Sequence, residues 1–339
     1  MQFHRRRRPR YLRRLLVLVL LLVLAAGAAV RFSPWPAALI LRQVHEAEAA
    51  RAMAALAPLV PAGLAERRDV NYLGAGPETR MDLILPPGPA PATGWPVVVW
   101  LHGGAWVAGD KADVGNYARL LAGQGVAVVA VNTPRAPAAR HPEPARHAHA
   151  ALAWLAAHGP GAGLDMAQVV LAGNGTGAQI AAQAGLAQVD AGYADRLALR
   201  PALPPGALRG LVLFGGVYDP GALVLPVPLG RLRARVAEAY FGPGGPTATD
   251  LALYDIAGNL PADLPPLFVS AGPADPRAPQ SAALAEAAEA KGLRADSLFF
   301  AAEAAVPHYP FDLTAPAGRA GFDRMLAFLN GVFSRPAAP

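Results

Sequence analysis

The chain has 339 residues, a formal net charge of +6 and no cysteine, so disulfide bonds are excluded. Seven arginines among the first fourteen residues supply more than the whole excess, and everything after them carries a formal charge of −1. The positive net charge is therefore confined to the N-terminus and does not indicate a general nucleic-acid-binding surface. Hydrophobic residues make up 53% of the chain, but only one stretch approaches the length of a membrane span, which excludes a polytopic membrane protein.

That stretch lies directly after the arginine cluster. Residues 15–30 include no polar side chain and would form about 24 Å of helix, a length that flanking Arg14 and Arg31 can extend by snorkelling. We expect a cytoplasmic tail over 1–14, a single transmembrane anchor over 15–35 and an extracytoplasmic body. The alternative is a cleaved signal peptide, because small residues at 25–29 follow a short apolar region.

A helical segment is expected between the anchor and the main domain, over residues 36–68. Apolar residues recur at mixed spacings of three and four over 37–57, and Pro58 and Pro61 end the pattern. This segment is either a lid over a site or a spacer packed on the domain.

The remaining residues, 69–339, alternate apolar runs with helical patterns, which predicts an α/β domain with a mostly parallel sheet and helices on both faces. The run 81–85 ends at two prolines and is predicted as an early strand at the sheet edge. Further strands are predicted at 97–101, 126–131, 169–172, 211–214, 267–270 and 298–300, and helices at 113–122, 144–158, 176–188, 280–291 and 320–333. Residues 221–265 are rich in proline and glycine and interrupt the alternation as an insertion.

The turn after the run 169–172 has the frame of a nucleophile elbow. Its sequence is Gly-Asn-Gly-Thr-Gly, and a G-x-S-x-G motif in this strand–turn–helix setting places the central side chain above the sheet. Gly175 occupies that central position, and no serine lies between Ser33 and Ser270. Thr176 carries the nearest hydroxyl, but one place past the apex its side chain should point away.

A second loop of the same kind follows the run 97–101. There His102 precedes Gly103 and Gly104, and a glycine pair lets backbone N–H groups face a developing oxyanion. His102 is expected to hold this loop by hydrogen bonds and not to act as a base.

An acid and a base are expected after the late strands, in the order that hydrolases of this topology use. Asp275 follows 267–270 and is the candidate acid, with Asp219 as the fallback; His308 follows the last strand and is the candidate base. His147 and His149 lie two residues apart on a helix, hence on different faces, so we expect no metal site and no cofactor.

These motifs together resemble the α/β-hydrolase superfamily, in particular the esterase/lipase group similar to hormone-sensitive lipase and to bacterial feruloyl-esterase-like carboxylesterases. The resemblance covers about 69–333 and implies an α/β-hydrolase fold behind the N-terminal transmembrane helix. It implies oxyanion donors at the backbone N–H groups of Gly103, Gly104 and Thr176, an acid at Asp275 and a base at His308. The group's elbow reads G-D-S-A-G, whereas this chain has Asn174, Gly175 and Thr176 at the three central places.

Two function classes follow. The first is a carboxylic-ester hydrolase of weak or lost activity, since loss of the nucleophile of a triad costs on the order of 10⁶ in turnover. The second is a membrane-anchored binding protein that keeps the site for a small apolar ester or acyl ligand without turnover. The backbone at an elbow apex is strained for residues other than glycine, and glycine relieves that strain. Gly175 is therefore the residue that the backbone favours once covalent catalysis is not required.

Overall fold

The computed structural model describes residues 10–74, 76–220, 229–301 and 309–334. Within these residues, eight strands form one sheet in the order β1-β2-β4-β3-β5-β6-β7-β8. The strands are β1 (Ala65–Asn71), β2 (Arg80–Leu85), β3 (Trp95–Leu101), β4 (Ala127–Val131), β5 (Leu164–Asn174), β6 (Leu208–Phe214), β7 (Leu267–Ser270) and β8 (Ala295–Leu298). The pairs β1–β2 and β2–β4 are antiparallel and all others are parallel. The predicted mostly parallel sheet is confirmed.

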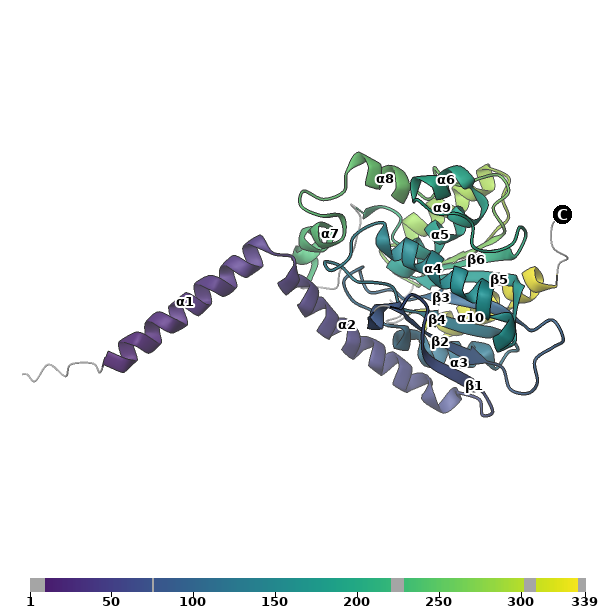
Figure 1. Cartoon of the computed structure of the whole chain (residues 1–339), viewed down its shortest axis with the longest axis horizontal. Coiled ribbons are helices and arrows are strands. Elements are labelled where there is room, and N and C mark those ends of the chain that lie inside the picture. Colours follow the sequence, from purple (N-terminus) through teal and green to yellow (C-terminus); the bar gives the residue numbers. More distant parts are fainter. Residues whose placement is uncertain (1–9, 75, 221–228, 302–308, 335–339) are drawn as a thin grey trace, which may run out of the picture.

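Helices cover both faces of the sheet, as predicted (Figure 1). The helices are α1 (Arg10–Phe32), α2 (Trp35–Leu56), α3 (Gly115–Ala122), α4 (Glu143–His158), α5 (Thr176–Val189), α6 (Ala191–Arg196), α7 (Arg233–Phe241), α8 (Ala248–Tyr254), α9 (Ala278–Ala290) and α10 (Pro316–Phe333). Successive residues of a strand point to opposite faces. In β3, Val97, Val99 and Leu101 therefore pack toward α4, α5 and α9, whereas Val98 and Trp100 pack toward α2, α3 and α10.

The edge of the sheet differs from the sequence-based prediction. The strand over 81–85 was expected at the edge, but β2 pairs with β1 on one side and with β4 on the other. The strand at this edge of the sheet is β1, whose side chains are mostly charged and exposed and therefore form no apolar run in the sequence. The last strand, β8, also begins before the predicted run 298–300 and ends at Leu298.

Two α-helices form in the described part of the insertion, residues 229–265. Helices α7 and α8 lie beside the N-terminal half of α2 in a third apolar cluster, separate from the two faces of the sheet. This cluster includes Trp106 and Val107 of the loop after β3, so the insertion packs directly on a predicted site loop.

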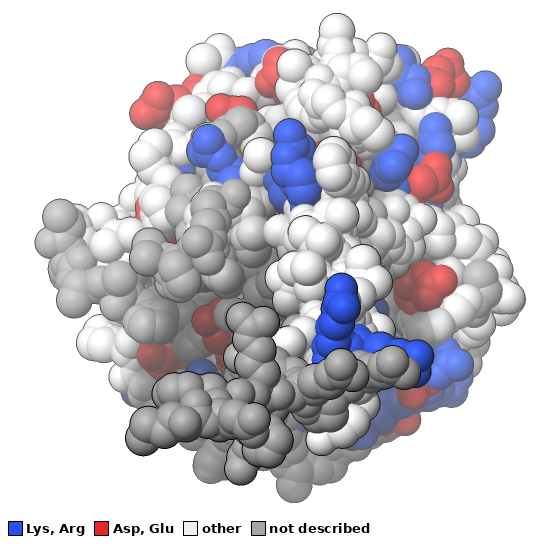
Figure 2. Space-filling model, turned by 90° about the vertical axis from the view of Figure 1, so that its left-hand side faces the viewer, with Lys and Arg blue, Asp and Glu red and all other residues white. Residues whose placement is uncertain are grey.

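Helix α1 projects away from the domain, whereas α2 lies along it (Figure 1). Within Tyr11–Phe32, an 18-residue window has a mean hydropathy of 2.7 and no described residue of that window is buried, so by length and composition the helix can cross a membrane. On the face toward which α1 projects, Lys and Arg are interspersed with Asp and Glu around uncharged surface (Figure 2). Of the described residues, no group of three or more His, Cys, Asp or Glu side chains is arranged to hold a metal ion.

Candidate active site

The loop after β3 turns sharply at its glycine pair. Gly104 has a φ of +125°, and a Cβ at this position would lie 2.3 Å from the carbonyl oxygen of Ala108. A side chain is thus excluded by both conformation and space. The backbone N–H groups of Gly103 and Gly104 donate no hydrogen bond to any described residue, which leaves them available to a ligand oxygen.

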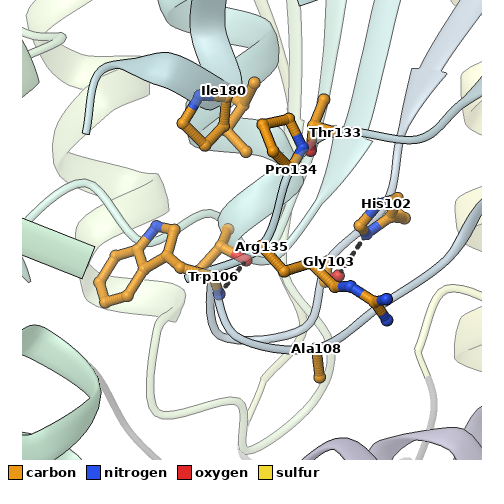
Figure 3. Close-up of a pocket in the computed structure, with 10 residues that line it drawn as sticks. His102, Gly103, Trp106, Ala108, Thr133, Pro134, Arg135 and Ile180 are labelled. Carbon is orange, nitrogen blue, oxygen red and sulfur yellow. Dashed lines mark hydrogen bonds between the residues drawn. The ribbon is translucent and has the colours of Figure 1, made fainter. Parts of the chain in front are cut away.

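His102 stabilises this loop and remains uncharged. Its Nδ1 donates to the carbonyl oxygen of Gly103 over 2.8 Å (Figure 3), and burial lowers its pKa because the charged ring loses solvation. Nε2 therefore carries no proton, and it has no partner within the described residues. This geometry fits the expected structural role of His102.

The next two residues have strained backbones that their neighbours hold in place. Ala105 and Trp106 have φ values of 52° and 62°, a conformation that costs on the order of 1–3 kcal/mol for each residue other than glycine. The N–H of Trp106 donates to Oγ1 of Thr176 over 3.3 Å (Figure 3), and the N–H of Ala136 donates to the carbonyl of Trp106 over 2.9 Å.

Helix α2 also fixes the loop from outside. The Nε of Arg42 donates to the carbonyl of Val107 over 2.7 Å, and its Nη2 donates to the carbonyl of Ala136 over 3.0 Å. A pocket of about 10 Å³, enough for about one water molecule, opens between this loop and α5, with Thr133, Pro134 and Arg135 on its other side (Figure 3).

The turn between β5 and α5 has the geometry of an elbow. Gly175 has φ 56° and ψ −125°, and its N–H donates to the carbonyl of Phe214 over 2.8 Å. A Cβ on Gly177 would lie 2.2 Å from the carbonyl oxygen of Leu101, so the glycine frame allows the close packing of turn and strand. Among the described residues, a Cβ on Gly175 would meet only Nη1 of Arg277 at 3.2 Å and Cα of Gly103 at 4.0 Å, so these residues leave the apex open.

Thr176 lies at the first position of α5 with its side chain buried. Its hydroxyl accepts the hydrogen bond from Trp106 and thus points at the loop after β3. Its own backbone N–H is one of the unsatisfied donors of a helix N-terminus. The structure therefore brings Gly103, Gly175 and Thr176 together.

Asp275 follows β7 and forms a two-point ion pair with Arg277. Nε of Arg277 donates to Oδ1 and Nη2 donates to Oδ2, each over 2.9 Å. The Asp275 side chain is 10% exposed and that of Arg277 is 31% exposed. Gly215, at the end of β6, allows this approach, because its Cβ would lie 2.9 Å from Oδ2 of Asp275.

Arg277 was not identified as a site residue from the sequence. It follows the candidate acid by two residues, and an arginine in the turn before a helix has no motif of its own. Asp219, the fallback acid, is exposed at the surface after β6. His308, the predicted base, lies outside the described residues.

Comparisons with known proteins agree with this architecture. A model of the alpha/beta hydrolase fold family matches residues 98–304. Esterase LipQ of Mycobacterium tuberculosis is 26% identical over 282 residues, which cover 80% of this chain and 63% of that protein. The chain thus spans less than two thirds of the length of this relative.

Solved structures show the same fold. Esterase B of Lactobacillus rhamnosis superposes with a TM-score of 0.75 at 23% identity, covering 88% of this chain and 96% of that one. A structure of the same esterase inhibited by a C4-C4 tributyrin phosphonate gives a TM-score of 0.72 at 24% identity, with the same coverage. The family model covers the strands and loops that build the site, and the chain belongs to the alpha/beta hydrolase fold family.

Proposed function

We propose that this chain is a membrane-anchored protein of the carboxylic-ester hydrolase type whose esterase activity is weak or lost. One observation carries the proposal: Gly175 stands at the apex of an otherwise intact elbow. Without a nucleophile there, no acyl-enzyme forms, and the expected loss in turnover is on the order of 10⁶.

The rest of the site supports binding of a small apolar ester or acyl ligand. Gly103, Gly104 and Thr176 offer backbone N–H donors at the end of the sheet, where a ligand carbonyl oxygen would lie. A relative of this fold is inhibited by a phosphonate of tributyrin, a compound with acyl chains. In this proposal Asp275 and His308 occupy the positions of the orienting acid and the base.

A second candidate is a binding protein without catalytic function. The ion pair of Asp275 with Arg277 favours it, since both carboxylate oxygens already accept hydrogen bonds from a residue outside the predicted triad. Both candidates share the anchor over 15–35, which the apolar window of helix α1 supports.

A fluorophosphonate probe tests the proposal. Full-length protein should show no covalent labelling and no burst of product from an activated short-chain ester, whereas Gly175→Ser should be labelled. Labelling of the wild-type chain at Thr176 would contradict the proposal and indicate a displaced nucleophile. Thr176→Val is the matched control for that outcome.

A further inference from the structure

Arg277 places a cation beside the position that a nucleophile would occupy. Its Nη1 lies 3.2 Å from the point where a Cβ on Gly175 would be. We propose that the vacant apex, together with the donors of Gly103, Gly104 and Thr176, binds the carboxylate of a short acyl chain. This inference rests on the proposed absence of covalent turnover.

The guanidinium is held in a fixed orientation, with one nitrogen that makes no hydrogen bond to the described part of the chain. Nε and Nη2 are paired with Asp275, and the backbone N–H of Arg277 also donates to Oδ1 of Asp275 over 2.8 Å. Nη1 makes no hydrogen bond to a described residue. Asp275 therefore orients the guanidinium of Arg277 from the side away from Gly175, and Nη1 faces the apex.

A carboxylate fits the donors on the two sides of the apex. One oxygen would accept from the backbone N–H groups of Gly103, Gly104 and Thr176, as a carbonyl oxygen would. The second oxygen would fill the space that Gly175 leaves open and accept from Nη1 of Arg277. Hydrogen bonds to a charged donor are stronger than those to a neutral one, so the site should distinguish a carboxylate from the isosteric neutral amide.

Two neighbouring charges bear on this inference. The carboxylate of Asp275 offsets part of the positive charge, but it lies on the side of the guanidinium that Nε and Nη2 face. Arg135 is a second cation, which lines the pocket beside the loop and donates from Nη1 to the carbonyl of Gly109 over 3.3 Å. The experiment must therefore distinguish the contribution of Arg277 to ligand binding from that of Arg135.

The test is a titration of carboxyl-labelled ¹³C-butyrate, followed by NMR, against the full-length protein in lipid nanodiscs. Wild type should bind butyrate more tightly than butyramide. Arg277→Gln should weaken butyrate binding by about 10-fold or more, the range for loss of a charge-assisted hydrogen bond, and should leave butyramide binding unchanged. Arg319→Gln, on the exposed surface of α10, is the matched control and should bind both ligands as wild type does.

Three outcomes would overturn the inference: no butyrate binding by wild type, equal loss of both ligands in Arg277→Gln, or loss in Arg135→Gln but not in Arg277→Gln. Arg277→Lys keeps the positive charge but lacks the planar guanidinium. It replaces Arg277→Gln in the titration if the glutamine variant does not fold. Fluorophosphonate labelling of the same samples separates the two proposals. If the probe labels wild type and butyrate binding still depends on Arg277, only the proposed loss of activity is contradicted. If the probe does not label wild type and butyrate binding does not depend on Arg277, only the proposed carboxylate site is contradicted.

Discussion

The indole ring of Trp106 stacks on the phenol ring of Tyr240, with ring centroids 4.7 Å apart and planes only 4° from parallel. Phe241 and Tyr254 contact the same indole edge to face. The insertion thereby holds the strained loop after β3, because the ring contacts offset part of the cost of the positive φ of Trp106.

We therefore expect Tyr240→Ala to lower the free energy of unfolding by about 3–5 kcal/mol, the usual cost of removing a buried aromatic ring. Tyr240→Phe is the matched control. The buried Tyr240 hydroxyl has no hydrogen-bond partner within the described residues, so its removal should leave stability unchanged or raise it. Chemical denaturation followed by tryptophan fluorescence measures both, and an alanine variant as stable as wild type would contradict the assigned role of the stack.

The edge strand β1 is fastened to α3 by an ion pair whose effect depends on pH. Nε and Nη2 of Arg119 donate to the two carboxylate oxygens of Glu66 over 2.6 Å and 3.0 Å. These bonds, together with one that Nε of Arg68 donates to Oε2 over 2.8 Å, lower the pKa of Glu66 to about 2. A lowered pKa means that the native state favours the ionised carboxylate, so the stabilisation is present above the ordinary pKa and is lost as the pH falls toward 2.

Glu66→Gln should consequently lower the free energy of unfolding by roughly 1–2 kcal/mol at pH 7. The difference from wild type should shrink below about pH 4 and vanish near pH 2. Glu289→Gln, on the exposed surface of α9, is the control and should show no such difference at either pH. A destabilisation by Glu66→Gln that is independent of pH would show that packing, not charge, is responsible.

Gly175→Ser is expected to restore measurable hydrolysis of short acyl esters. The oxyanion donors remain, and each is typically worth about 3 kcal/mol in such sites. The serine Cβ would lie 3.2 Å from Nη1 of Arg277, closer than most Cβ contacts. Gly175→Ser combined with Arg277→Ala should therefore have a higher kcat/KM than the single variant. The positive φ makes serine cost about 1–3 kcal/mol in stability.

The control for this rescue is Gly175→Ser combined with His308→Ala. Hydrolysis should vanish there, since an unassisted serine is a poor nucleophile at neutral pH. A single variant that folds but stays inactive would show that the site has changed beyond the elbow, with Asn174 the next residue to replace.

The anchor is tested by washing membranes with alkaline carbonate. Full-length chain should stay in the membrane fraction, because residues 15–30 of α1 include no polar side chain. Recovery of a soluble chain that begins near Ala29 or Val30 would identify a signal peptide instead.

The sequence predicted most of the central sheet because buried parallel strands are short apolar runs. The runs at 97–101 and 126–131 lie within or beside β3 and β4, which are buried between the helical layers. The two glycine-rich loops were predicted for the same reason, since each follows such a run.

Other features depend on contacts that no local pattern encodes. Strand β1 has a charged sequence and is defined by its pairing with β2. Helices α7 and α8 form in a segment rich in proline and glycine, where packing on Trp106 and on α2 outweighs weak propensity. The approach of Arg277 to Gly175 joins two loops about a hundred residues apart, so only the folded chain shows it.

Helix α2 determines where the chain can be cut. It buries Ala38 and Leu41 against the insertion and Met53 and Leu56 against α3, and its Arg42 holds the loop after β3. A truncation at Asp69 would expose these surfaces and divide β1, which begins at Ala65. A shortened protein meant to retain the ligand site should therefore begin at Ser33, between α1 and α2.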